Sequence, residues 1–168
     1  MGKNSYEIPY RVAVNVEGQS HGASITADVD TAVYAAGDVL FATTLALNDV
    51  NRIEGRSVKL QGITGAEDGG QAPAITFLFF HAVPTQTGAR NAAAAWGVGT
   101  SKKFAGMARI VGSDWYTVGS KSFLSLGALE TYLTVEGTDL YMVAIADNAY
   151  DAVLAGDLSL TFHFERDL

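Results

Sequence analysis

Histidine, the side chain best suited to proton transfer and metal binding near neutral pH, occurs at three positions in this chain. These are His21, His81 and His163. No two of them lie two or four residues apart, the spacings that bring imidazoles to one side of a strand or a helix. The chain also has no cysteine, which excludes thiol catalysis and cysteine-bound zinc. The sequence therefore predicts no metal ligands and no metal cofactor.

The sequence supports catalysis by hydroxyl or carboxylate groups little more than it supports metal binding. No Gly-x-Ser-x-Gly segment is present, and the glycine-rich stretch at 97–102 lacks the spacing of a phosphate-binding loop. Aspartate and glutamate total 18, and two of them could meet in space as a glycosidase pair whatever their sequence separation. A carbohydrate-binding or hydrolysing role therefore stays open. We nevertheless expect no catalytic residues, no cofactor and no enzymatic activity.

The charge balance and the hydropathy pattern exclude several kinds of partner. The 168 residues carry 11 Lys and Arg against 18 Asp and Glu, a formal net charge of −7. Affinity for DNA or RNA depends on clustered cations, so we expect no nucleic-acid partner. No segment is apolar over the ~20 residues that a membrane helix needs, and the first ten residues lack the apolar stretch of a secretory signal. We expect no membrane partner, and synthesis in the cytoplasm.

Aromatic and cationic residues in loop-like segments are the candidates for contacts with protein partners. Tryptophan and tyrosine are enriched among the residues that dominate interface energies, and cations on an acidic protein can form complementary electrostatic contacts. An ordered N-terminal arm must also bury some of its side chains. The candidate interface residues are Tyr6, Ile8, Pro9, Tyr10, Arg52, Arg56, Trp96, Lys102 and Lys103. For the four cations, ordinary surface charge is an equally good interpretation.

Short apolar runs separated by turn residues predict the elements that position these side chains. Such runs, with a period of two, are typical of strands in an antiparallel sandwich or barrel. The predicted strands span 11–17, 24–29, 39–47, 57–63, 74–83, 104–111, 115–118, 131–135, 140–146 and 158–164. Residues 89–96 and 122–131 favour one or two short helical turns. The sequence thus predicts one all-β domain, an antiparallel β-sandwich over residues 11–168, preceded by an extended arm at 1–10.

Several segments of the chain occur in an order that resembles a known family. They are YAAGDVL at 34–40, GRSVKL at 55–60, EDGGQ at 67–71, PAITFLFF at 73–80 with Pro84 after it, WY at 115–116 and GTDLY at 137–141. This order resembles small structural proteins of tailed bacteriophages, of the head decoration (cement) type. The resemblance implies a jelly-roll-like β-sandwich, a homotrimer at three-fold positions of the capsid, and no catalytic residues.

The expected function follows from that resemblance and from the scarcity of catalytic signals. We expect a capsid decoration protein, located on the virion surface, that stabilises the bacteriophage head by bridging subunits of the major capsid protein. Each trimer would span several capsomers, so that its contacts act together. A head–tail or tail component of the virion is one alternative. A carbohydrate-binding jelly-roll module is another.

Overall fold

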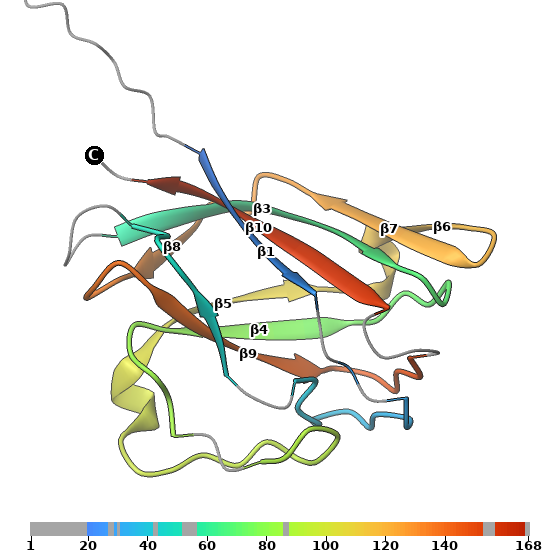
Figure 1. The fold of residues 1–168 in the computed structure, drawn as a ribbon, viewed down its shortest axis with the longest axis horizontal. Coiled ribbons are helices and arrows are strands. Elements are labelled where there is room, and N and C mark those ends of the chain that lie inside the picture. Colours follow the sequence, from blue (N-terminus) through green and yellow to red (C-terminus); the bar gives the residue numbers. More distant parts are fainter. Residues whose placement is uncertain are drawn as a thin grey trace, which may run out of the picture.

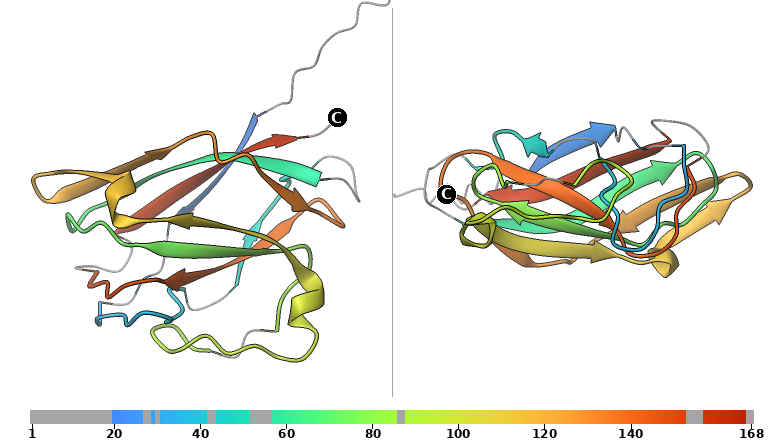
Figure 2. Two further views of the ribbon diagram at one scale, coloured as in Figure 1. Left: turned by 180° about the vertical axis from the view of Figure 1, so that it is seen from behind. Right: turned by 90° about the horizontal axis from the view of Figure 1, so that it is seen from below.

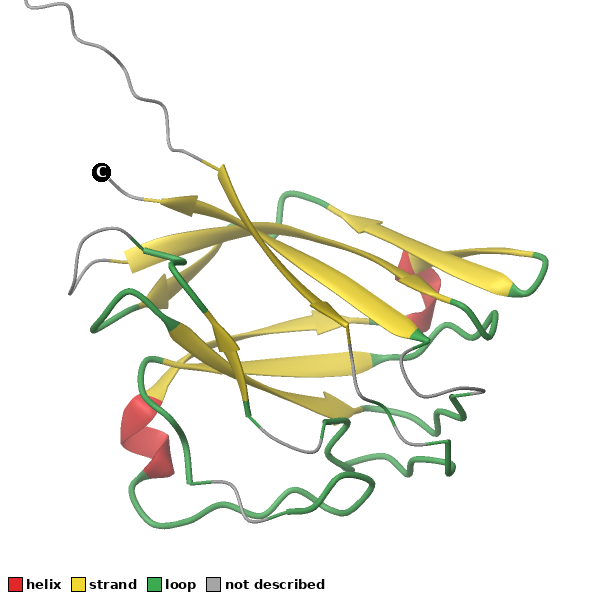
Figure 3. Cartoon of the chain, in the orientation of Figure 1, coloured by secondary structure: helices red, strands yellow, loops and turns green. Residues whose placement is uncertain are grey.

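The computed structural model describes residues 20–26, 29, 31–41, 44–51, 57–85, 88–152 and 157–166 of the chain (Figure 1). Strands dominate these residues, and the two helices are single short turns (Figure 3). The strands are β1 Ser20–Thr26, β2 Leu45–Leu47, β3 Ser57–Glu67, β4 Ile75–Phe80, β5 Phe104–Ile110, β6 Trp115–Val118, β7 Lys121–Leu126, β8 Thr131–Thr134, β9 Leu140–Ala146 and β10 Leu158–Arg166. The short 3₁₀ helices are η1 Thr100–Lys103 and η2 Gly112–Asp114.

The strands form two antiparallel sheets that pack face to face (Figure 2). The first sheet has the order β1-β10-β3-β7-β6, with β8 also paired to β3, and the second has the order β2-β9-β4-β5. If β7 and β8 are taken as one interrupted strand and β6 as an added edge, eight strands remain, four in each sheet. Their order is that of a jelly roll, in which two Greek keys build a double-sheet sandwich. The predicted all-β, jelly-roll-like sandwich is confirmed.

Alternating side chains from both sheets fill the core between them. On β4, Ile75, Phe77 and Phe79 point inward and are fully buried. The ring of Phe162 on β10 meets Phe77 and Phe79 edge to face, with centroids 5.1 and 5.8 Å apart. Edge-to-face pairs of this kind add to the free energy gained from burial alone. These three rings therefore join the two sheets at their centre.

The second sheet is apolar on its outer face as well. There Val143 on β9 and Phe80 on β4 are buried together with Val39, and partly buried side chains pack around them: Leu78, Ala94, Tyr141 and Ile145. Two chain segments, 37–40 and 90–94, cover this face. They are joined by hydrogen bonds from Val39 N to Ala92 O (2.9 Å) and from Ala94 N to Gly37 O (3.1 Å). Strands β4 and β9 are apolar on both faces, as expected for strands whose outer face is also largely covered.

Both predicted helical segments are wrong, because their backbone groups pair with other parts of the chain. The stretch 89–96 is extended, and its amides and carbonyls bond residues 37–39 instead of forming helical turns. Residues 122–126 belong to β7 and pair with β3. The predicted strand at 11–17 and the arm at 1–10 lie outside the described residues. Within the described part of the chain, no helix is long and apolar enough to cross a membrane.

Candidate interaction surface

The three histidines lie in three separate places. His21 is in β1, which begins before the predicted strand at 24–29, and its Nε2 is 3.2 Å from the carbonyl oxygen of Asn48. His163 Nε2 is 2.9 Å from Thr64 Oγ1, across β10 and β3. His81 follows β4, with Nδ1 3.1 Å from a carboxylate oxygen of Glu136. Among the described residues, no three His, Asp or Glu side chains group so that they could hold a metal ion.

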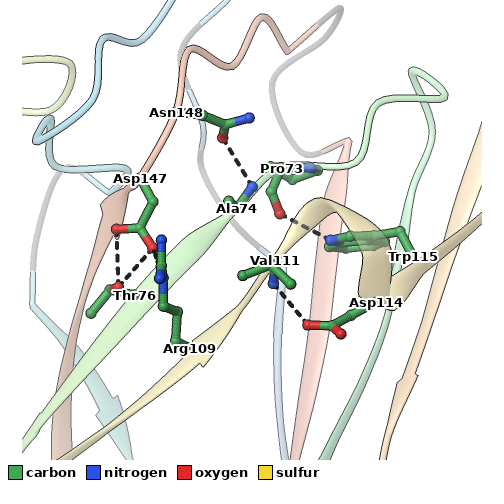
Figure 4. Close-up of polar contacts among 9 residues, drawn as sticks. All are labelled: Pro73, Ala74, Thr76, Arg109, Val111, Asp114, Trp115, Asp147 and Asn148. Atoms are coloured by element: carbon green, nitrogen blue, oxygen red, sulfur yellow. Dashed lines mark hydrogen bonds and ion pairs between the residues drawn. The ribbon is translucent and has the colours of Figure 1, made fainter.

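The most connected polar cluster is structural in character (Figure 4). One carboxylate oxygen of Asp147, just after β9, accepts hydrogen bonds from Arg109 Nε (2.6 Å) and Thr76 Oγ1 (2.9 Å). The backbone N–H of Asp147 donates to Ala74 O, at 2.9 Å. The cluster thus ties the neighbouring ends of β4, β5 and β9 with charge-assisted hydrogen bonds. Its geometry accounts for the position of Asp147 without any ligand.

An apolar groove opens on the outer face of the second sheet, where the cover described above ends. Its volume is about 550 Å³. Strands β4 and β5 form one wall, and residues 96–101 form the other. The lining residues are Leu78, Phe80, Trp96, Gly97, Val98, Gly99, Thr100, Ser101 and Phe104. The groove is therefore an uncovered continuation of the apolar outer face.

Large aromatic side chains in this groove are accessible to solvent. Trp96 is 39% exposed and Phe104 is 46% exposed, while Val98 is fully exposed. Both aromatic rings pack on Phe80, with centroids 5.7 Å apart for Trp96 and 6.0 Å apart for Phe104. Exposed apolar patches of this kind mark contact sites for other proteins more often than isolated apolar side chains do.

The groove is held in shape by bonds within the loop that forms it. Gly97 N donates to Thr85 O at 2.7 Å, and Thr100 Oγ1 donates to the same oxygen at 3.2 Å. A Cβ at Gly97 would lie 2.5 Å from Thr85 Cγ2, so only glycine permits this close approach. Lys103 Nζ donates to Val83 O at 2.7 Å. Because these bonds fix the wall, a partner would not have to order it on binding.

Three of the nine candidate interface residues come together at this groove. Trp96 lies in its wall, and Lys102 and Lys103 follow directly in η1. Lys102 is exposed, whereas Lys103 is half-buried and bonded to Val83 O. The other six, Tyr6, Ile8, Pro9, Tyr10, Arg52 and Arg56, lie outside the described residues, so their roles stay predictions.

The sequence interpretation missed the strand side of the groove. The run that contains Leu78 and Phe80 suits a strand in the middle of the sandwich or one covered by a neighbouring subunit, and Phe104 was expected only to begin a strand. One signal was present: the run from Phe77 to Phe80 places apolar groups on both faces of one strand, which requires a cover on the outer face. The sequence does not show where that cover ends. Residues 90–94 are held over β9 by hydrogen bonds to Val39, which is distant in the chain and itself pairs with Ile145 of β9.

A second exposed apolar area lies on the β6–β7 hairpin. Tyr116 and Phe123 are cross-strand neighbours on its outer side, and Val118 lies near them. This area is the exposed surface of a two-stranded edge and not a groove. Trp115, the first residue of β6, does not contribute to it, because its side chain points into the core and its Nε1 donates to Pro73 O at 2.9 Å. We expect the hairpin to contribute less to binding than the groove, because energetically dominant contacts sit in desolvated pockets.

Comparisons with known proteins add little. No family model matches the chain, and no curated protein matches it. A solved structure of the Gx strain of infectious bursal disease virus is similar over 90% of this chain, at 13% sequence identity and a TM-score of 0.30. The match spans 38% of that chain. The fold described above depends on the strand order and register, not on this weak similarity.

Proposed function

We propose that this protein is a structural component of a bacteriophage virion, a decoration protein that binds subunits of the major capsid protein on the outside of the head. The observation that carries the proposal is the preformed apolar groove with Trp96 and Phe104 exposed in it. The order of sequence segments that resembles phage decoration proteins supplies the identity of the partner. The Asp147 cluster is explained by the ties that it makes among β4, β5 and β9.

In this proposal the groove receives an apolar side chain or short loop of a capsid subunit. Trp96 and Phe104 would lose their remaining exposure, and the rigid wall at 96–101 would limit the entropy lost on binding. Lys102 at the rim would favour an acidic partner surface and speed association more than it adds affinity. A homotrimer would present three such grooves, so that weak single contacts combine into stable attachment.

Co-sedimentation with bacteriophage heads that lack this protein tests the proposal. Wild-type protein should sediment with the heads at a saturating stoichiometry and distribute over the whole shell in a particle reconstruction. Trp96→Ala and Phe104→Ala should each weaken binding by about 30-fold, the effect of losing a buried aromatic anchor worth roughly 2 kcal/mol. Tyr116→Ala, which removes an exposed aromatic residue from the hairpin, is the control and should bind normally.

Three results would count against this function. Wild-type protein that stays monomeric and never sediments with heads would contradict it. Labelling of a single vertex would instead identify a head–tail or tail component. Loss of binding in Tyr116→Ala with normal binding in Trp96→Ala would place the contact on the hairpin and not in the groove. Circular dichroism of each variant confirms that it is folded before binding is compared.

A further inference from the structure

A second groove, of different chemistry, lies on the outer face of the first sheet. Its volume is about 390 Å³. The lining residues are Lys59, Gln61, Gly62, Thr64, Ser125, Leu126, Gly127, Ala128, Glu130 and His163. The sheets place it on the side of the sandwich opposite the groove at Trp96. Neither the proposed function nor the core packing requires a depression here.

Two irregularities of the sheet create this groove. The register of β10 on β3 shifts between His163 and Phe164, which leaves Gln61 as an extra residue on β3. Across from it, residues 127–130 separate β7 from β8, although both strands pair with β3. Ala128 and Glu130 adopt positive φ angles of 57° and 47° in this interruption. Such backbone costs free energy for residues other than glycine and recurs at ligand sites.

Glycine at position 62 is required for the close approach of the two strands here. A Cβ at Gly62 would lie 2.5 Å from the carbonyl oxygen of Leu126. The bond from Leu129 N to Gln61 O, 3.1 Å long, then fixes the interrupted segment beside the bulge. The floor of the groove is therefore built by the backbone and does not depend on flexible side chains.

Hydrogen-bond donors and acceptors alternate along the groove. Lys59 Nζ is 3.2 Å from Glu130 Oε1, and Gln61 Nε2 donates to Glu165 Oε2 at 2.7 Å. One cation against two carboxylates leaves one excess negative charge, which does not favour a phosphate or another strong anion. Groups of both kinds within one small depression suit a ligand whose own groups both donate and accept, as hydroxyl groups do.

Tyr132 provides an aromatic surface beside Lys59, one of the residues that line the groove. It is the register partner of Lys59, so the two side chains share the outer face of the sheet. Its side chain is 64% exposed, with Lys59 Nζ 5.9 Å from the ring centroid. An accessible ring beside paired polar groups can cover the apolar C–H face of a ligand whose hydroxyl groups are bound by its neighbours.

We propose that this groove binds a neutral saccharide, with the ring of Tyr132 against one sugar face and Lys59, Gln61, Thr64 and Glu130 bonding its hydroxyl groups. The cavity lies within the size range of small-molecule sites, about 300–1,000 Å³. Sugar hydroxyl groups would replace the Lys59–Glu130 ion pair at little cost, because Glu130 is 70% exposed and such surface pairs are weak. Saccharide binding does not depend on the capsid-binding function, since the two grooves lie on opposite sheets.

An array of bacterial surface polysaccharides and of neutral mono- and disaccharides is the first test, followed by NMR titration with the best binder. We expect at least one saccharide to bind, with amide shifts concentrated at Gln61, Gly62, Thr64 and Gly127. Tyr132→Ala should weaken binding by about tenfold or more. Its matched control, Tyr116→Ala, changes an exposed tyrosine of the same sheet and should leave the affinity within about twofold.

Thr64→Val supplies an independent variant, since it keeps the shape of the side chain and removes one hydroxyl group. It should weaken saccharide binding by about fivefold, as expected for one lost hydrogen bond. The proposal is overturned if no saccharide binds at about 5 mM, a concentration well above the roughly millimolar Kd of a weak small-molecule site. It is also overturned if the shifted amides lie elsewhere, or if Tyr132→Ala and Thr64→Val both bind as the wild type does.

Discussion

The two outer faces of this sandwich differ in chemistry although both belong to antiparallel sheets of one domain. Over β1, β10 and β3 the outer face is polar and open to solvent, with Ser24, Thr161 and His163 on it. Over β9 and β4 it is apolar and lies mostly beneath residues 37–40 and 90–94. The polar face satisfies its own hydrogen bonds, whereas the apolar face needs a cover. The part that the chain leaves uncovered is therefore the best site for a protein partner.

The largest effect should come from removing the side chain on which the apolar face is built. Phe80→Ala takes away the ring that contacts both Trp96 and Phe104, and we expect a loss of about 3–4 kcal/mol in the free energy of unfolding. The matched change on the polar face, Thr161→Ala, removes a hydrogen bond to Ser24 and should cost less than about 1 kcal/mol. Urea denaturation of both variants checks this difference. Equal losses would contradict the contrast between the faces.

The loss of an ionic contact should also cost more stability on the apolar face than on the polar face. Asp147→Ala leaves Arg109 and Thr76 without their shared acceptor at a half-buried position, so we expect a loss of about 1–2 kcal/mol. Glu130→Ala removes an exposed partner of Lys59 on the polar face and should change stability by less than about 0.5 kcal/mol. Added salt should reduce the smaller effect further. A larger loss of stability in Glu130→Ala than in Asp147→Ala would show that burial does not determine how much each ion pair stabilises the fold.

Two stacked tyrosines inside the molecule differ in whether the hydroxyl group has a hydrogen-bond partner. Tyr34 and Tyr150 have ring centroids 6.0 Å apart, and Tyr34 Oη donates to Leu40 O at 3.1 Å. The hydroxyl of Tyr150 is buried with no hydrogen-bond partner in the described part of the chain, and burial raises its pKa. Tyr34→Phe should therefore cost about 1 kcal/mol, and Tyr150→Phe should be neutral or stabilising. Thermal unfolding of both variants measures the difference, and a larger loss for Tyr150→Phe would refute it.

The smallest expected effect concerns a carboxylate buried at the end of β3. Glu67 accepts backbone N–H bonds from Gly69 (3.0 Å) and Gln71 (2.6 Å). Burial nevertheless raises the pKa of Glu67 above its ordinary value of 4.5. The neutral acid is thus favoured in the folded protein, so its contribution to stability is full below pH 4.5 and is lost as the pH rises through the folded-state pKa.

The variant Glu67→Gln isolates this contribution because its side chain is neutral at every pH. The free energy of unfolding of the wild type minus that of the variant should fall as the pH rises from about 4 to about 7. Urea denaturation at a series of pH values gives this difference directly. A difference that rises with pH would mean that the two backbone N–H donors, and not burial, control the pKa of Glu67.

The sequence predicts strands well where side chains alternate in a strand that pairs regularly. The predicted ranges 115–118 and 140–146 coincide with β6 and β9. Strand β7 was missed because residues 122–131 contain good helix formers, Leu124, Leu126, Ala128 and Leu129, and were assigned a helical turn. Its extended state depends on pairing with β3, whose bulge at Gln61 has no local sequence signal. The helical prediction at 89–96 failed for a related reason, since Val39 and Gly37 bind its backbone groups.

The candidate site could be predicted only in part. The position of Trp96 between the alanine run and Gly97 pointed to this residue, and Lys102 and Lys103 were chosen for their charge. The wall formed by Leu78 and Phe104 depends on how β4 and β5 meet, which is a property of the sheet and not of any short segment. The polar groove on the first sheet was equally hidden, because its residues come from β3, β10, β7 and the interruption between β7 and β8.

The pairing of β1 with β10 has a consequence for how this protein is made. Consecutive strands mostly cross between the two sheets, and β1 pairs along its whole length only with β10, near the other end of the chain. The first sheet cannot close on the ribosome until β10 has emerged. Folding should accordingly be slow for a domain of this size, since most of its contacts are non-local. Until then the apolar sides of β3 and β4 are exposed during synthesis, and nascent chains are vulnerable to aggregation during that interval.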